Sequence, residues 1–458
     1  METISRKLAR FAAGLKYENL PPRAVAEAKR FLIDSLGCAV GGTQTHDARI
    51  MREFIEEEGG RAEATLIGTR KKVPASWAAF YNALVVRALD YNDIYWKADP
   101  SHPSDILPAA LAIAEKLGTG GKDVLLGIVI GHELEMRFCE AAEPGIRERG
   151  WHHATLTAFV APIVAAKMLG LDSARIQHAI GISGSRMATF GAVTAGKLTM
   201  MKNTVDPLAT QSGVLAALLA ERGYTGPEHV IEGKEGLVHC LGPQWKLEIL
   251  EHGLGQSYRI GRCGMKAFPT EALTHAPISC TLDLVREHDL RPEQIERVHI
   301  RSLGRAADIL ADPSKYDPRS KETADHSLPY VIACAIAERQ VTPLQFTEAK
   351  IMDPTIRAQL KKVVVVADPE IEALFPELQR VVVTIRTSDG RELTRQIDFP
   401  KGDPRNPLTD AEIEEKFDAL AEPVLSPDRR RQVKEAVWTL ERQEAITDLM
   451  HLLRSDRA

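Results

Sequence analysis

Five polar segments of this sequence combine histidine, lysine, aspartate or tyrosine, and each lies beside an apolar stretch. They occupy positions 89–95 with 101–105, 150–155, 199–203, 264–275 and 325–330. Removing a proton from a carbon next to a carboxylate requires a base, together with cations that stabilise the developing negative charge. Taken together, the segments predict a cationic pocket with acid and base groups, suited to a small polycarboxylate substrate.

The first segment contributes Asp90, Asn92, His102 and Ser104 as candidate site residues. Asp90 stands at the end of an expected helix, where the helix dipole disfavours a carboxylate. Ser104 or Asp105 is expected to cap the next helix, whose first turn would also present free N–H groups to an anion. A plain loop with capping residues explains the same pattern, so this segment alone does not decide between structure and function.

The other segments contribute His152, His153, Lys202, Lys266 and Tyr330. Adjacent histidines at the mouth of an apolar helix can act as acid or base near neutral pH, although a capping turn is the structural alternative. A lysine among apolar residues is commonly an exposed end whose stem packs on the surface. Lys266 is expected just outside a helix that starts near position 269, with Glu271 in its first turn.

Several familiar motifs are incomplete in this chain. The glycine-rich stretch at 118–123 lacks the P-loop pattern, and His132-Glu133 has no second histidine four residues later, as a zincin site requires. The stretch at 181–185 misses the last glycine of a nucleophile elbow. No strand leads into G-x-G-x-x-G, so a nicotinamide cofactor is not expected. Six scattered cysteines without C-x-x-C spacing argue against a zinc ribbon, a redox site or an iron–sulfur cluster.

Composition sets the broad class of the protein. The chain has 458 residues, 44% hydrophobic and 26% charged, with a formal net charge of −5. This length predicts two or three domains, and the slightly acidic balance gives no basic footprint for nucleic acid. No apolar run reaches the roughly 20 residues of a membrane span, and the first 20 residues lack the core of a signal peptide. We therefore expect a cytoplasmic protein with no membrane partner.

Helical periodicity dominates the first 220 or so residues. The expected helices cover 75–89, 104–117, 124–141, 155–169, 173–182 and 208–221. Several are apolar on nearly all faces, which is typical of helices inside a bundle. Frequent alanine and glycine would let such helices approach closely.

The pattern changes from about residue 262. Strands are expected at 297–302 and 362–367, and 380–399 reads as a hairpin around Asp389-Gly390. Helices at 270–287, 330–338 and 354–361 predict, with these strands, an α+β domain with a mainly antiparallel sheet. After a linker at 400–407, helices at 410–420 and 429–453 are expected to pack back onto the first domain.

The five segments resemble the MmgE/PrpD family, which includes 2-methylcitrate dehydratase, cis-aconitate decarboxylase and iminodisuccinate epimerase. The likeness runs from about residue 7 to 425 in the same order. It rests on ALDYNDIYWKADPSHPSD, GWHHATLTAFVAPIVAAKMLGL, TMMK with GVLAALLAERG eleven residues beyond the lysine, MKAFPTEALTH and ADHSLPYVIACAIAE.

This resemblance implies an α+β fold of two domains. A large all-helical domain would comprise 1–261 and 401–458, and a smaller α+β lid domain would comprise 262–400. The resemblance also implies a homodimer with no metal and no organic cofactor. The site residues it implies are Asp90, His102, His152 or His153, Lys202, Lys266 and Tyr330.

Departures from the family pattern bear on the reaction. Ile94 stands where relatives usually have threonine, so one hydroxyl contact is lost. The decarboxylase branch has a histidine five residues after the lid lysine, where this chain has Glu271. The dehydratase branch has Asp-His where this chain has His152-His153, which leaves open which histidine faces the substrate. The spacing from Asp90 to His102 matches the dehydratase branch better than the decarboxylase branch.

The leading prediction is a cofactor-independent hydro-lyase that dehydrates a 2-methylcitrate-like tricarboxylate. Asp90 and the histidines would transfer protons, with His102 the first choice. The lysines would bind carboxylates, and Tyr330 would position the substrate or the leaving hydroxyl. The alternatives are an epimerase of a dicarboxylate such as iminodisuccinate, a cis-aconitate-type decarboxylase and a non-catalytic helical binding protein.

Overall fold

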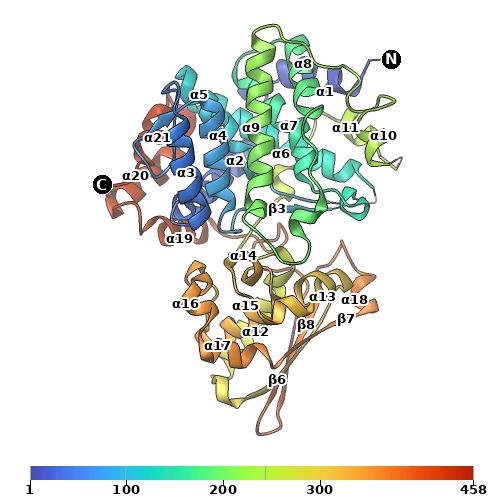
Figure 1. The fold of residues 1–458 in the computed structure, drawn as a ribbon, viewed down its shortest axis with the longest axis vertical. Coiled ribbons are helices and arrows are strands. Elements are labelled where there is room, and N and C mark those ends of the chain that lie inside the picture. The colour runs from blue at the N-terminus through green and yellow to red at the C-terminus, as the bar shows by residue number, and fades with distance from the viewer. Residues whose placement is uncertain (1, 98, 144, 243, 457–458) are drawn as a thin grey trace. The chain divides into compact units, whose positions relative to one another are not determined.

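The structure is a computed structural model that describes residues 2–97, 99–143, 145–242 and 244–456. It is mostly helical with small sheets, which confirms the predicted mixed α+β class (Figure 1). Two compact units make up the chain: Met1–Ala192, Asn203–Cys263 and Thr409–Ala458 form the first, and Val193–Lys202 and Gly264–Leu408 form the second. That one of them is a lid over the other stays a prediction.

The first unit is a helical bundle with two small strand pairs. Strands β1 (Ala64–Thr65) and β2 (Lys72–Val73) pair antiparallel, as do β3 (Asp93–Trp96) and β4 (Pro100–Ser101). The α-helices are α1 (Ile4–Gly14), α2 (Pro22–Gly42), α3 (His46–Glu58), α4 (Ala75–Arg87), α5 (Leu107–Leu117), α6 (Gly121–Ala141), α7 (Ala154–Met168), α8 (Ser173–Gly184), α9 (Met201–Glu221, whose first two residues fall in the second unit), α10 (Leu237–Leu241), α11 (Glu248–Glu251), α19 (Asp410–Ala421), α20 (Pro427–Trp438) and α21 (Thr447–Leu452).

Helix α7 lies in the core of this bundle, since all but one of its residues are buried. Small residues allow its neighbours to come close. A Cβ on Gly213 of α9 would lie 2.6 Å from Ala161 of α7, and a Cβ on Gly42 of α2 would lie 2.0 Å from the Val85 carbonyl oxygen of α4. Both distances are shorter than van der Waals contact, so only glycine fits these two crossings. The expected close packing of small-residue faces is confirmed there.

The second unit contains one four-stranded sheet and short helices. The sheet has the order β7-β6-β8-β9, in which β6 pairs parallel with β7 and antiparallel with β8. The elements are β5 (Gly264–Met265), α12 (His275–Glu287), β6 (Ile295–Ser302), α13 (Gly304–Leu310), α14 (Lys321–Ala324), α15 (Leu328–Glu338), α16 (Glu348–Ile351), α17 (Pro354–Leu360), β7 (Val363–Ala367), α18 (Pro369–Glu372), β8 (Val381–Thr387) and β9 (Glu392–Ile397).

The hairpin expected at 380–399 is confirmed as β8 and β9. Gly390 in its turn has φ +90°, a conformation that glycine adopts without strain. Residues of β8 alternate between buried and more exposed, as a strand with one face on a core must. The sheet is mainly antiparallel, as predicted, with the β6–β7 pair as its parallel part.

The single helix expected at 429–453 is wrong. Helix α20 ends at Trp438, a 3-10 turn follows at Leu440–Arg442, and α21 begins at Thr447. The backbone between them bonds to the start of α6 and to the loop before it: Gly121 N–H donates to the Gln443 carbonyl, and Ile446 N–H donates to that of Thr119. These long-range bonds replace the intrahelical ones and end the helix.

Two helix starts and one helix cap also differ from prediction. Helix α9 begins at Met201 and runs through Pro207, so Lys202 lies inside it rather than ahead of it. Helix α12 begins at His275, and Glu271 caps a preceding 3-10 turn by accepting the Leu273 N–H at 2.7 Å. Ser104 caps no helix. No helix among the described residues is long and apolar enough to cross a membrane.

Candidate active site

The nine predicted site residues divide between the two units. Those of the first unit are Asp90, Asn92, His102, Ser104, His152 and His153, and those of the second are Lys202, Lys266 and Tyr330. All nine side chains are buried. Because buried polar groups need partners, the contacts of each set indicate what it can do.

The loop after α4 forms the first part of the site. Asp90 has a left-handed backbone with φ +50°, which turns the chain out of the helix. The Asn92 side-chain amide donates to Ser104 Oγ at 3.0 Å, and Ser104 Oγ in turn donates to Asp93 Oδ1 at 2.6 Å. Ser104, expected as a helix cap, thus ties the two ends of this loop together.

His102 is held by a bond to the backbone of the same loop. Its Nδ1 lies 2.5 Å from the Asp93 carbonyl oxygen. A carbonyl oxygen only accepts, so Nδ1 carries the proton in this bond. Nε2 is therefore the ring nitrogen of a neutral His102 that is able to take a proton.

His152 and His153 stack at the N-terminus of α7 and extend the cluster. Their ring centroids are 3.9 Å apart, and the His153 ring lies 5.4 Å from that of His102. His152 Nδ1 accepts the Ala154 N–H at 3.2 Å, which leaves the proton of the neutral ring on Nε2. Burial and the neighbouring His153 hold the pKa of His152 well below its ordinary value. Three histidines, predicted from two separate segments, therefore meet in one unit.

Two residues that sequence reasoning missed complete this cluster. Asp206 of α9 places Oδ1 3.4 Å from His153 Nε2 and Oδ2 3.8 Å from an Arg87 guanidinium nitrogen. Arg87 of α4 also lies 4.0 Å from Asp105. Arg87 Nε and Nη1, both Asp206 oxygens, Asp105 Oδ2 and His153 Nε2 are buried without a hydrogen bond. Such atoms require a further partner, for instance a polar substrate or ordered water.

The charges around Asp206 set its ionisation. Burial alone would raise its pKa, but His153 and Arg87 outweigh burial and hold the pKa far below the ordinary value. Glu135 of α6 behaves in the opposite way: burial raises its pKa to about 7, although Ser101 and Thr157 donate hydrogen bonds to it. Asp206 therefore keeps its charge at neutral pH, whereas Glu135 titrates near pH 7.

Lys202 of the second unit takes part in a compact ion network. Its Nζ lies 3.2 Å from Asp325 Oδ1, and Lys321 Nζ lies 3.0 Å from Oδ2. His326 Nδ1 also contacts Asp325, at 2.7 Å. Burial acts to raise the pKa of Asp325, but Lys202 and Lys321 hold it well below the ordinary value. Lys202 and Lys321 thus share the carboxylate of Asp325.

Lys266 and Tyr330 lie elsewhere in the second unit. Lys266 follows β5 directly and is almost completely buried. The Tyr330 hydroxyl donates to the Gln345 carbonyl at 2.5 Å, and burial raises the pKa of this phenol. This bond favours a role for Tyr330 in holding α15 to the 3-10 turn at Pro343–Phe346. Its role in catalysis stays a prediction.

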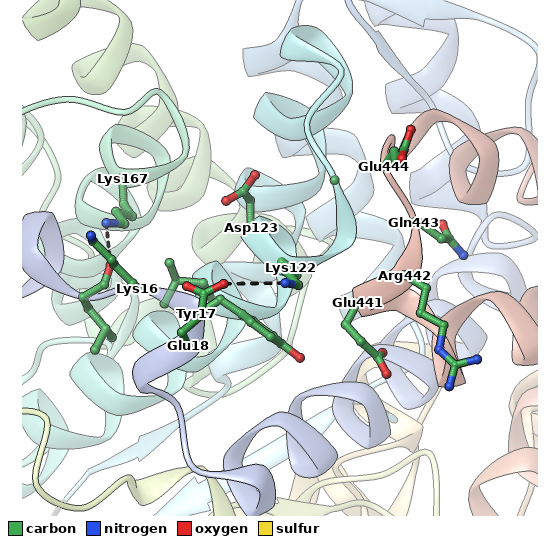
Figure 2. A pocket seen from close by; sticks show the side chains of 13 residues that line it. Lys16, Tyr17, Glu18, Lys122, Asp123, Lys167, Glu441, Arg442, Gln443 and Glu444 are labelled. Atoms are coloured by element: carbon green, nitrogen blue, oxygen red, sulfur yellow. Dashed lines mark hydrogen bonds and ion pairs between the residues drawn. The ribbon is translucent and has the colours of Figure 1, made fainter.

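A hollow of about 490 Å³ lies in another part of the first unit (Figure 2). It contains none of the predicted site residues. Its lining carries both charges: Lys122 lies 3.6 Å from Glu18, and Lys167 donates to the carbonyls of Ala13 and Leu15. Because these charges compensate one another, the hollow lacks the excess of positive charge that a polycarboxylate requires.

Comparison with known sequences assigns the chain to a family. The MmgE/PrpD N-terminal domain matches residues 6–250, and the MmgE/PrpD C-terminal domain matches residues 268–442. The chain belongs to the MmgE/PrpD family. The resemblance stated from the five segments is thereby confirmed.

Similar members of this family carry two different activities in their names. Human cis-aconitate decarboxylase is 28% identical over 99% of this chain and 95% of its own length. Cis-aconitate decarboxylase of Aspergillus terreus is 25% identical over 98% of this chain and 96% of its own length. The 2-methylcitrate dehydratase of Salmonella typhi is 24% identical over 85% of this chain and 84% of its own length.

Arg87 and Asp206 carry only weak signals in the sequence. Arg87 is the one charged residue of α4, and Asp206 is one of two between positions 200 and 220. A charge within an apolar helix is almost never fully buried unless it is paired. In the sequence each residue is a single charge within an apolar helix. Only the tertiary fold brings Arg87 of α4 close to Asp206 of α9.

Proposed function

We propose that this protein is a lyase that removes a proton next to a carboxylate of a small polycarboxylate, with dehydration of a 2-methylcitrate-like tricarboxylate as its reaction. The C–H bond next to the carboxylate breaks, the C–OH bond on the neighbouring carbon breaks, and a C=C bond forms. A base takes up the proton, and an acid returns one to the leaving hydroxide, which departs as water. The reaction needs no electron acceptor.

The observation that carries the proposal is the cluster of three histidines with Asp206 and Arg87. His102 Nε2 is suited to the base because its Nδ1 proton is bound to a carbonyl. His153 is suited to the acid because its Nε2 lies 3.4 Å from the negatively charged Asp206 carboxylate. The buried, unbonded atoms of Arg87 offer donors to a carboxylate. Asp90 and His152 remain candidates for proton transfer, Asn92 and Ser104 for substrate binding, and Lys202 and Lys266 for carboxylate binding.

Decarboxylation of a cis-aconitate-like acid is the second candidate. The decarboxylases named above match nearly the whole chain, which favours it. Glu271 opposes it, because a carboxylate that caps the turn at 272–274 occupies the place of the histidine found in the decarboxylase branch. We therefore prefer dehydration, in which the substrate keeps all of its carboxylates.

The test is a panel of acids incubated with the full-length protein: 2-methylcitrate, citrate, cis-aconitate and iminodisuccinate. We expect alkene absorbance in the ultraviolet to appear with 2-methylcitrate, without release of carbon dioxide. Carbon dioxide released from cis-aconitate would assign the second candidate instead. A change in optical rotation without new alkene would indicate an epimerase, and no change with any acid would favour a binding protein.

A further inference from the structure

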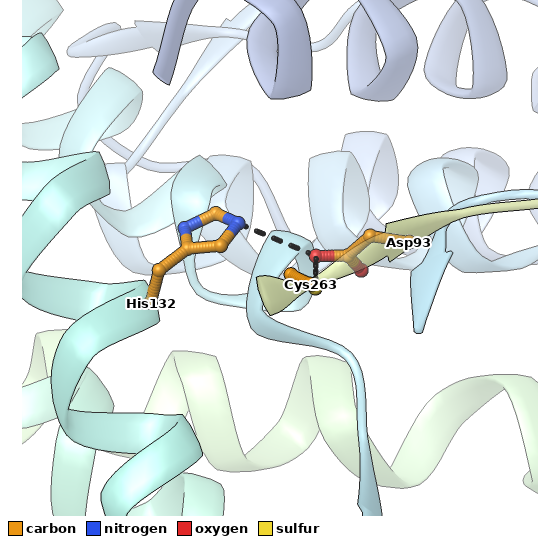
Figure 3. Close-up of side chains that lie close together, drawn as sticks. All are labelled: Asp93, His132 and Cys263. Carbon is orange, nitrogen blue, oxygen red and sulfur yellow. Dashed lines mark hydrogen bonds and ion pairs between the residues drawn. The ribbon is translucent and has the colours of Figure 1, made fainter. Parts of the chain in front are cut away.

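Asp93, His132 and Cys263 form a second buried cluster in the first unit (Figure 3). Asp93 begins β3, His132 lies in the middle of α6, and Cys263 follows the 3-10 turn at Arg259–Arg262. All three side chains are buried, and none is among the predicted site residues. The fold thus brings together a carboxylate, an imidazole and a thiol from residues that are far apart in the sequence.

The separations between their polar atoms fit a common ligand. His132 Nε2 lies 3.4 Å from Asp93 Oδ2, and Cys263 Sγ lies 3.7 Å from the same oxygen. One possible ligand atom from each residue lies within 4.8 Å of the other two. Around a tetrahedral Zn²⁺ with bonds of about 2.0–2.3 Å, neighbouring ligand atoms are separated by about 3.3–3.7 Å. The two separations to Asp93 Oδ2 agree with that geometry.

The orientation of His132 is the second observation. Its Nδ1 lies 2.9 Å from the Ile128 carbonyl oxygen, so Nδ1 carries the proton of this bond. Nε2 then directs its lone pair at the Asp93 carboxylate, and it is buried without a hydrogen bond. Two lone pairs facing each other repel unless a proton or a cation lies between them. A ring nitrogen oriented by a carbonyl bond on the other side is the usual arrangement of a metal-binding histidine.

Asp93 is also held as a metal-binding carboxylate would be. The Ser104 backbone N–H donates to Oδ2 at 3.0 Å, and the Ser104 hydroxyl donates to Oδ1. These bonds fix the carboxylate without using all of its lone pairs. By contrast, the group of His152, His153 and Asp206 has the Arg87 guanidinium 3.8 Å from its carboxylate, and this positive charge opposes a second cation.

We propose that Asp93, His132 and Cys263 bind one divalent cation of the Zn²⁺ class. On binding, the Cys263 S–H bond breaks, its proton leaves to solvent, and the thiolate sulfur bonds to the metal. The thiolate and the carboxylate then balance the two positive charges of the ion, and the buried site is neutral. A thiolate ligand favours Zn²⁺ or Co²⁺ over Mg²⁺ and Ca²⁺, which take oxygen ligands.

The cation would act on the fold rather than on the substrate. It would join β3 to α6 and to the segment at Cys263, and it would fix the residue whose carbonyl oxygen holds His102. This role differs from the acid and base chemistry proposed above, so the two proposals fail independently. No sequence motif indicates this site, because its ligands come from three distant parts of the sequence.

The first test measures metal in the full-length protein. After dialysis against Zn²⁺ and then against buffer, elemental analysis should find about one zinc per chain. Replacement by Co²⁺ should give a thiolate-to-cobalt charge-transfer band in the near ultraviolet. A wild-type protein that keeps no zinc and shows no such band overturns the proposal.

Variants then assign the ligands. Cys263→Ala should lose both the bound zinc and the charge-transfer band, whereas Cys280→Ala, which removes a buried thiol of the second unit, should keep both. His132→Gln should weaken Co²⁺ binding at least tenfold and keep the band at high Co²⁺, which provides a test if Cys263→Ala does not fold. Equal zinc content and an unchanged spectrum in Cys263→Ala would assign the metal to another site and overturn the proposal.

Discussion

Each unit buries an aspartate among cations, but the two arrangements differ. Asp325 contacts Lys202, Lys321 and His326 at 2.7–3.2 Å. Asp206 lies 3.4–3.8 Å from His153 and Arg87, and neither of its oxygens is hydrogen-bonded. The first network is satisfied within the protein, whereas the second has polar atoms that still require a partner. Burial and charge are common to both networks, so our proposed reaction site rests on the unsatisfied polar atoms beside the histidines.

The largest effect on stability should come from breaking the satisfied network. Asp325→Asn leaves Lys202 and Lys321 without their shared carboxylate, and removing one partner of a buried ion pair costs about 3–5 kcal/mol. Urea unfolding should show this loss in the free energy of unfolding. Asp317→Asn, which removes exposed ion pairs of the same unit, should leave the midpoint almost unchanged. Equal urea midpoints for Asp325→Asn and Asp317→Asn would show that the Asp325 network does not stabilise the fold.

The next effect concerns Glu135, whose pKa is raised by burial from 4.5 to about 7. Between these values the native carboxyl keeps its proton while the unfolded one has lost it. The free energy of unfolding therefore falls as the pH rises through this window, by about 3 kcal/mol. Urea unfolding at pH 5 and pH 8 should show the fall in wild type and much less of it in Glu135→Gln. An identical pH dependence in both proteins would show that Glu135 is not the group.

Asp206→Asn tests whether the Asp206 network, unlike that of Asp325, contributes mainly to activity. The neutral amide keeps the shape but removes the negative charge beside His153 Nε2, so kcat should fall about tenfold to a hundredfold. Stability should fall less than in Asp325→Asn, because the charge contacts of Asp206 at 3.4–3.8 Å are longer than those of Asp325 at 2.7–3.2 Å. The measurements are steady-state kinetics with the active acid and urea unfolding of both variants. An unchanged kcat together with a loss of unfolding free energy as large as that of Asp325→Asn would show that Asp206 has a structural role.

The smallest effect is expected for Lys266→Ala, which removes one predicted carboxylate-binding charge. KM should rise about tenfold, equivalent to about 1.4 kcal/mol, while kcat changes little. Lys361→Ala removes an exposed lysine of the same unit and serves as the matched control. If KM is the same in both variants, Lys266 does not bind the substrate.

Local patterns predicted the elements well where the chain's own spacing decides them. The hairpin at 380–399 and the all-round apolar α7 followed from alternation and composition. The break after Trp438 could not be predicted, because the bonds that end α20 come from the start of α6 and the loop before it. The helix expected at 208–221 likewise begins earlier, because the packed helix α9 starts at Met201 and runs through Pro207.

Residue types and spacing also predicted three of the five residues in the cluster of the first unit. His102, His152 and His153 stood out because they occur in polar segments beside apolar helices. Arg87 and Asp206 occur as single charges in apolar helices, and only the tertiary fold pairs them. His132 was set aside with its incomplete zincin motif, although the fold places it beside Asp93 and Cys263.

The central claim is that the histidine cluster of the first unit performs the proton transfer. Its most direct test is kcat for dehydration of 2-methylcitrate by His102→Gln, compared with wild type and with His178→Gln, a histidine of α8 outside the cluster. We expect kcat to fall about 10²–10⁴-fold in His102→Gln, while its circular dichroism remains that of a folded protein. Near-wild-type turnover by His102→Gln would contradict the central claim.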